Sequence, residues 1–196
     1  MDPQVGPASE GPAGTGQERQ GAVMEAKGVA KGLAVLRIAL GAGFLYAGID
    51  KVVHFGGGTA FDATGFLAHA TAGTAPGAAE GAIVNPTNGF WVALAGEPAL
   101  MSAVNVLVVF GEIAIGLALI LGIATRFAGI CGALMMGLFY IASWDFAHGL
   151  VNEQFLYGIL SAFVAYAKAG EAYGFDAIID KTATVKAHPS LRFVLG

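Results

Sequence analysis

The chain has 196 residues, of which 56% are hydrophobic and 12% are charged, and its net charge is −4 at neutral pH. Soluble domains carry about 25% charged residues, so this composition, with a mean hydropathy of +0.67, favours an integral membrane protein. The basic residues lie near the ends of apolar segments and form no patch, so we expect no nucleic-acid partner. Cys131 is the single cysteine, which excludes an intrachain disulfide and a dithiol redox centre.

The N-terminal part changes character near residue 25. Residues 1–24 consist mainly of Gly, Pro, Ala, Gln and Glu, which predicts a disordered tail, and they lack the basic start and apolar core of a cleaved signal. The first long apolar segment, residues 33–53, follows Lys27 and Lys31 and is long enough to cross a hydrocarbon core of about 30 Å. It predicts the first transmembrane helix.

Residues 54–100 are rich in Gly, Ala and Pro, with only short apolar pieces. These polar interruptions predict an extramembrane loop. Asp62 is expected to start a short amphipathic helix, and Phe90 with Trp91 to anchor at the membrane interface, where aromatic rings are enriched.

Three further apolar segments complete the predicted fold, an all-α membrane protein with a bundle of four transmembrane helices. The four helices are expected at about residues 33–53, 103–124, 127–144 and 151–169. The connection at Thr125 and Arg126 is short, so the second and third helices should form an antiparallel hairpin. The membrane domain is expected to span residues 25–180, followed by a cytoplasmic tail at 181–196.

Basic residues indicate the orientation. They precede the first helix, separate the second from the third and follow the fourth, whereas the other two connections carry mostly Asp, Glu and His. By the positive-inside rule, both termini are expected in the cytoplasm and the extended 54–100 loop outside, in a multi-pass protein of the plasma membrane. Rows of small residues on each helix are consistent with close packing.

Two ionisable residues lie inside the predicted helices. Glu112 lies about 14 Å along the second helix, near mid-bilayer, with Asn105 two turns earlier on the same face. Two interpretations stay open: a proton-accepting or quinone-contacting carboxylate, or a structural carboxylate that is neutral or bonded to another helix. Arg37 enters the first helix near its cytoplasmic end, so snorkelling to the interface is favoured over a contact with Glu112 about 13 Å away along the axis.

The outer helix ends gather a polar cluster. The first helix finishes with Asp50, Lys51 and His54, and the third with Trp144, Asp145 and His148, followed by Asn152 and Glu153. Such a cluster is suited to binding a quinone head group and relaying its protons, or it is a set of solvated helix caps. We take Glu112, Lys51, His148 and Asp145 as candidate catalytic residues, and His54, Trp144, Asn105 and Arg37 as candidate quinone-binding residues.

Other cofactor chemistry finds no support in the sequence. No short His or Glu spacing places metal ligands on one helix face, so no metal site is expected. The chain also has no phosphate-binding loop, no dinucleotide fingerprint and no nucleophile elbow. If the protein does redox work, a partner subunit is expected to hold the cofactor.

Three segments resemble the DoxX/DoxD family of small four-helix membrane proteins: RIALGAGFLYAGIDKVV at 37–53, GEIAIGLALILGIATRFAGICGALMM at 111–136 and KAGEAYGFDAII at 168–179. The resemblance covers about residues 33–180, and the long insertion between the first two helices is more like DoxD than shorter DoxX proteins. It implies a subunit of thiosulfate:quinone oxidoreductase, whose partner DoxA has no counterpart in this chain. The residues that match the family motifs are Arg37, Gly48, Lys51, Glu112, Gly116, Arg126 and Asp176.

The leading hypothesis is therefore a DoxD-like membrane subunit in the quinone-linked oxidation of a small sulfur compound such as thiosulfate. The alternative is a non-catalytic accessory or scaffold subunit of a membrane redox complex. A small-solute transporter is less favoured, because the sequence shows no paired broken helices in corresponding halves. Membrane lipid and one or more partner subunits are the expected partners.

Overall fold

The computed structural model describes residues 16–55, 60–67, 85–144 and 150–195, and these residues form helices, turns and short irregular segments without a strand. Three helices in this part of the chain are long and apolar enough to cross a membrane, within Gly16–Val53, Pro98–Leu121 and Thr125–Ala142. The all-helical membrane fold predicted from the sequence is thereby confirmed, with three candidate spans.

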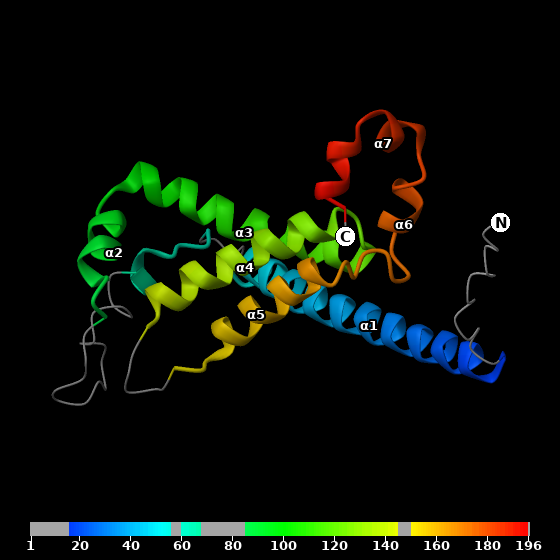
Figure 1. The fold of residues 1–196 in the computed structure, drawn as a ribbon. Helices are drawn as coiled ribbons and strands as arrows, with labels where there is room; N and C mark the ends of the chain where they lie inside the picture. Colours follow the sequence, from blue (N-terminus) through cyan, green and yellow to red (C-terminus); the bar gives the residue numbers. More distant parts are fainter. Residues whose placement is uncertain (1–15, 56–59, 68–84, 145–149, 196) are drawn as a thin grey trace, which may run out of the picture.

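The first helix, α1 (Gly16–Phe55), is much longer than a membrane span. Its 40 residues reach about 60 Å at 1.5 Å per residue, twice the hydrocarbon thickness. Residues 16–32 are almost all exposed, and this half projects beyond the other helices (Figure 1). Residues 1–15 of the predicted disordered tail lie outside the described residues, but residues 16–24 are helical. Gln, Glu, Arg and Ala are good helix formers, and extending a nucleated helix is easier than starting one.

The helices α3 (Pro98–Leu121) and α4 (Thr125–Ala142) form the hairpin expected from their short connection. Pro98 stands in the first turn of α3, where its missing N–H costs no hydrogen bond. Gly122 ends α3 with φ +68°, a left-handed conformation that suits glycine.

The last bundle helix, α5 (Glu153–Tyr166), is 14 residues long and begins where the Asn152 side chain accepts a hydrogen bond from the Phe155 N–H. It is about 21 Å long, shorter than the predicted span at 151–169. The remaining residues to Gly170 form turns.

Small residues decide how the helices pair. α1 packs along α3 and α4 along α5, and α3 also contacts α4 (Figure 1). A Cβ atom added at Gly116 would lie 2.5 Å from the Leu45 backbone nitrogen, and one at Gly129 would lie 2.7 Å from the Ser161 carbonyl oxygen. Glycine therefore allows both helix pairs to bring their backbones together. The core between the pairs contains Leu40, Phe44, Ile115, Leu119 and Val164.

At one end of the bundle, the short helix α2 (Asn88–Ala95) covers α3, and we call this the α2 end. The buried Asn85 donates hydrogen bonds of 2.8 and 2.9 Å to the carbonyl oxygens of Ile141 and Ala142, which satisfies the C-terminus of α4. Thus the described parts of the predicted 54–100 loop include helical structure tied to the bundle. Of the two aromatic residues predicted to anchor at the membrane interface, Trp91 is buried here and Phe90 is exposed.

At the opposite end, where α3 turns into α4, the C-terminal residues fold into α6 (Asp176–Ile179), α7 (Ala183–Ala187) and the 3-10 helix η3 (Pro189–Phe193). We call this the turn end. The Phe127 N–H donates a 3.2 Å hydrogen bond to the Val194 carbonyl oxygen, so the predicted tail folds back on the start of α4.

Candidate functional site

Lys51 and Glu112 form an ion pair between α1 and α3. The Lys51 Nζ lies 2.9 Å from Oε1 and 2.8 Å from Oε2 of Glu112, and it also lies 3.4 Å from the Ala47 carbonyl oxygen. The Glu112 side chain is 3% exposed and that of Lys51 is 21% exposed. A buried carboxylate is strongly disfavoured without a partner, so Lys51 is the group that stabilises Glu112 in its ionised form.

The close crossing of α1 and α3 brings these two side chains together. A Cβ at Gly48 would lie 2.7 Å from Ile113 Cγ1 and 3.2 Å from Glu112 Cβ. Gly41 and Gly116 face each other earlier along the same crossing, where a Cβ on Gly116 would lie 2.8 Å from the Gly41 carbonyl oxygen. Any larger residue would separate the helices and move Glu112 away from Lys51.

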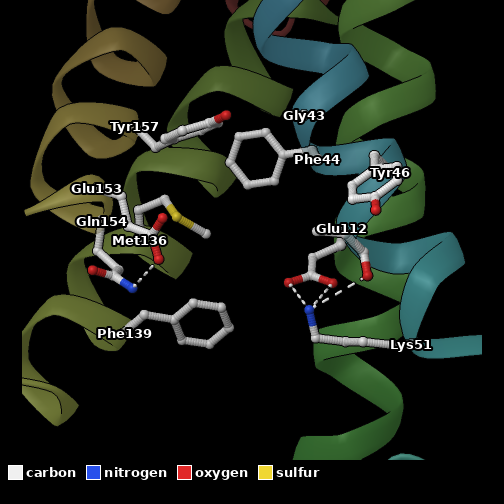
Figure 2. Close-up of a pocket in the computed structure, with 11 residues that line it drawn as sticks. Gly43, Phe44, Tyr46, Lys51, Glu112, Met136, Phe139, Glu153, Gln154 and Tyr157 are labelled. Carbon is white, nitrogen blue, oxygen red and sulfur yellow. Dashed lines mark hydrogen bonds and ion pairs between the residues drawn. The ribbon is translucent and has the colours of Figure 1, made fainter. Parts of the chain in front are cut away.

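The ion pair forms one wall of a pocket with a volume of about 340 Å³, near the lower limit of the roughly 300–1,000 Å³ typical of small-molecule sites. Figure 2 shows the pocket between two helix pairs. The α1 and α3 wall consists of Gly43, Phe44, Tyr46, Ala47, Lys51 and Glu112. The α4 and α5 wall consists of Met136, Phe139, Glu153, Gln154 and Tyr157.

Aromatic rings enclose the apolar part of this pocket. Phe44 and Tyr157 meet edge to face with their ring centroids 6.1 Å apart, which joins α1 to α5 beside the pocket (Figure 2). Phe61 lies with its ring centroid 5.6 Å from the Lys51 Nζ, a cation–π distance that helps hold the ammonium group in place.

The pocket carries more negative than positive charge. Its lining includes two carboxylates, Glu112 and Glu153, and one ammonium group, Lys51. Glu153 is exposed and accepts a 3.2 Å hydrogen bond from Gln154 Nε2. Because Lys51 already pairs with Glu112, the arrangement suits a neutral ligand with hydrogen-bonding groups better than an anion.

Only some of the candidate residues predicted from the sequence lie at the pocket. Lys51 and Glu112, which the sequence placed at different membrane depths, are in direct contact. Trp144 stacks on Tyr140, with ring centroids 6.4 Å apart, and is not among the pocket-lining residues. Asp145 and His148 lie outside the described residues, and of His54 only the helical backbone is described.

Asn105 has a different setting from the one expected. Its Nδ2 donates to Asp62 Oδ1 at 3.2 Å, and its Oδ1 accepts a 2.9 Å hydrogen bond from the Ala63 N–H. It thus ties residues 60–67 to α3 and does not line the pocket. The expected helical turn after Asp62 is present, since Thr64–Leu67 is helical.

Arg37 lies at the turn end, six residues before the first pocket-lining residue of α1, and it does not snorkel. Its side chain is fully buried, and Nη2 lies 3.5 Å from the carbonyl oxygens of Ala172 and Tyr173. A Cβ at Gly122 would overlap its Nη1. The guanidinium packs at the C-terminus of α3, where the carbonyl groups favour a cation.

Asp176 organises the same end. Its Oδ1 accepts a 2.7 Å hydrogen bond from the Ala124 N–H, and its Oδ2 accepts one of 2.9 Å from the Thr125 N–H. These contacts support the tight turn between α3 and α4, in which Ala124 has φ +50°. Arg37 and Asp176 are therefore best understood as structural residues of the turn end.

The family model described as TQO small subunit DoxD matches residues 33–194, most of the chain. The chain belongs to the DoxD family. No curated protein and no solved structure matches it.

For this DoxD protein, sequence reasoning missed the α4 and α5 wall of the pocket. In the sequence, the side chains of this wall look like ordinary core or lipid-facing residues, because a linear sequence does not show which helix pairs face each other. These residues are Met136, Phe139, Gln154 and Tyr157. The one usable signal was Glu153, which the sequence placed in the same polar cluster as Lys51.

Proposed function

We propose that this DoxD-family protein is a membrane subunit in the quinone-linked oxidation of a small sulfur compound such as thiosulfate, and that the Lys51–Glu112 pocket holds the quinone head group. The observation that carries the proposal is a buried carboxylate and its ammonium partner on the wall of an aromatic-lined pocket between the α1–α3 and α4–α5 helix pairs. The description of the family, a small subunit of TQO, supports the reaction class.

The position of the pocket supports a lipid-soluble ligand. It lies between the α1–α3 and α4–α5 pairs, and Tyr46 on its α1 wall is 73% exposed. In a bilayer, an exposed aromatic side chain on a spanning helix faces lipid or the membrane interface. A quinone dissolved in the hydrocarbon therefore reaches the pocket sideways, without crossing water.

The charge of the pocket favours one of the two half-reactions, quinone reduction, over oxidation of the sulfur compound. Thiosulfate is a dianion, and the pocket presents two carboxylates to one ammonium group, so the oxyanion is disfavoured there. We assign the sulfur compound and its electrons to a partner subunit, and the quinone half-reaction to this chain.

The two ion-pair residues are suited to transferring the protons of that half-reaction. Reduction of a quinone to a quinol takes two electrons, here from the partner, and two protons. Lys51 is a hydrogen-bond donor suited to a ring carbonyl oxygen, and Glu112 is a carboxylate that can accept a proton and pass it on. Glu153, exposed across the pocket, is placed to exchange protons with water.

Four crossings and two cytoplasmic termini are part of the same proposal, with α5 and the turns to Gly170 as the fourth crossing of the plasma membrane. Single cysteines at Glu97 and Lys186, in a Cys131→Ser background, test this in intact cells. An impermeant thiol reagent should label only the Glu97 position. Labelling at Lys186 instead of Glu97 would refute the orientation, and labelling at both positions would refute the fourth crossing.

The function is tested on the complex purified in mild detergent from the native membrane. Thiosulfate-dependent quinone reduction is expected, with bound quinone in the same sample. Glu112→Gln should lower this rate at least about tenfold while the complex still assembles, whereas Asp180→Asn, at an exposed ion pair far from the pocket, should not. Unchanged turnover in Glu112→Gln would refute the quinone site.

One observation favours the accessory role as a second candidate. Residues 16–32 of α1 form an exposed helical extension that projects beyond the other helices (Figure 1). Such an extension suits a subunit that holds a partner. Deleting residues 1–31 should then release the partner from the purified complex. A wild-type complex that holds its partner but shows no quinone reduction would favour this role over catalysis.

A further inference from the structure

The C-terminal residues form a compact surface feature that the proposed quinone reaction does not use. We call residues 177–195 the C-terminal lobe; it contains α7 and η3 and the end of α6. In Figure 1 the lobe projects to one side of the bundle at the turn end, across the direction of α3 and α4. Since α3 and α4 are candidate membrane spans, a feature that projects sideways from their end runs along the membrane surface.

The lobe is held in place by specific contacts. Arg192 Nε donates a 2.8 Å hydrogen bond to Asp180 Oδ1 within the lobe. The Arg126 guanidinium carbon lies 4.8 Å from the centroid of the Phe193 ring, which fixes the lobe to the start of α4. Val185, in the middle of α7, is buried. The lobe is therefore an ordered part of the structure at this membrane level.

Its charge is positive. The lobe contains three basic residues, Lys181, Lys186 and Arg192, and a single acidic residue, Asp180. Asp180 pairs with Arg192, and within the described part of the chain no ion pair is formed by Lys181 or Lys186, both of which are exposed. Two lysine charges are thus available to an external anion.

The same lobe exposes apolar side chains. Ile178 is 63% exposed and Phe193 is 62% exposed, and Leu191 is also exposed. Exposed apolar groups beside lysines are typical of segments that lie in the membrane interface, where long lysine side chains reach the head groups. A wholly aqueous setting would leave these apolar groups in contact with water at a cost.

We propose that the C-terminal lobe lies on the membrane surface and binds anionic phospholipid head groups through Lys181 and Lys186. Each basic residue near an anionic surface contributes about a fivefold preference for binding. The attraction acts over about a Debye length and is screened by salt. This inference concerns the turn end and does not depend on the quinone pocket.

The test uses the full chain reconstituted in vesicles, with Ser190→Cys in a Cys131→Ser background carrying an environment-sensitive dye. Vesicles of phosphatidylcholine alone are compared with vesicles containing about one-third phosphatidylglycerol, whose anionic head groups attract basic segments. A nitroxide on the lipid head group reports contact by quenching the dye. Quenching should be strong only with phosphatidylglycerol and should fall in high salt.

Lys181→Gln and Lys186→Gln should each lower the ratio of quenched to unquenched dye about fivefold in the anionic vesicles. Lys27→Gln with Lys31→Gln is the matched control, because these lysines lie on the projecting half of α1 and should leave quenching unchanged. Equal quenching in both vesicle types, or no effect of the lobe lysines, would refute binding of anionic lipid. No quenching in either would show that the lobe faces water or a protein partner.

Discussion

The Lys51 ammonium lies within 2.9 Å of both carboxylate oxygens of Glu112, although 61 positions separate the two residues in the chain. The pair exists because α1 and α3 cross at glycines and because Lys51 folds back toward the bundle interior. Its two members differ in exposure, since Glu112 is buried and Lys51 reaches the pocket. That asymmetry determines what removing either partner does.

Lys51→Met should destabilise the protein more than Glu112→Gln. Loss of Lys51 leaves a buried carboxylate without its cation, at a cost of about 3 kcal/mol. Loss of the Glu112 charge leaves a partly exposed ammonium group that is still hydrated through the pocket. Thermal unfolding of the two variants in the same detergent measures the difference. Equal destabilisation would show that Glu112 is more hydrated than its burial indicates.

Gly116→Ala should separate α1 from α3. The new Cβ would lie 2.5 Å from the Leu45 backbone nitrogen, and such overpacking costs about 1–3 kcal/mol. Gly137→Ala in α4 is the matched control, because nothing lies within 4 Å of its Cβ and alanine favours a helix by up to about 1 kcal/mol over glycine. Thermal unfolding should move in opposite directions for the two variants, and similar shifts would contradict the close crossing.

Much of the fold could be predicted from the sequence because long apolar segments and a short connection have few alternatives. The α3–α4 hairpin and the α1 span follow from segment length alone, although the turn lies at residues 122–124 and the predicted connection, Thr125 and Arg126, belongs to α4. The helix from Gly16 could not be foreseen from composition, because its first residues gain order by extending a helix that is stabilised further along.

The site was harder to predict for a geometric reason. The axial position of Glu112 follows from its place in α3, but the partner depends on the angle and register at which α1 crosses, set by Gly41, Gly48 and Gly116. Arg37 seemed suited to snorkelling, yet its side chain is buried against the carbonyl groups of Ala172 and Tyr173. A single sequence does not reveal which segments, far apart along the chain, are in contact.

Asp176→Ala should weaken the turn end. It removes the acceptor of the Ala124 and Thr125 N–H groups, and each buried donor left unsatisfied costs about 1–3 kcal/mol. Asp180→Ala, which breaks only the exposed pair with Arg192, should cost about 0–1 kcal/mol. Thermal unfolding distinguishes them, and an Asp176 variant as stable as the Asp180 variant would exclude this role.

Acid should loosen the residue 60–67 segment through Asp62. The Thr64 hydroxyl and N–H, with Asn105, donate to Asp62 Oδ1 and hold the pKa of that carboxyl below its usual range. A lowered pKa means that this stabilisation is complete above the ordinary value of about 3.9 and is lost as pH falls through the lowered value. Hydrogen-exchange protection of the Thr64 amide should decrease over that range.

Asp62→Asn is the control for this pH dependence. Asparagine keeps an acceptor oxygen but has no titrating carboxyl, so protection of Thr64 should be lower at neutral pH and should not change with acid. A variant with the same acid dependence as the wild-type protein would assign the effect to another group.

The most direct measurement of the central claim is a binding titration of the purified protein with a short-chain quinone, followed by tryptophan fluorescence. Ala47→Phe fills the pocket that Ala47 lines, whereas Ala114→Phe adds the same ring at an exposed site on α3. A quinone site in this pocket predicts a Kd raised at least about tenfold, or about 1.4 kcal/mol, by Ala47→Phe alone. Equal affinity in the two variants would show that quinone does not bind between Lys51–Glu112 and Tyr157.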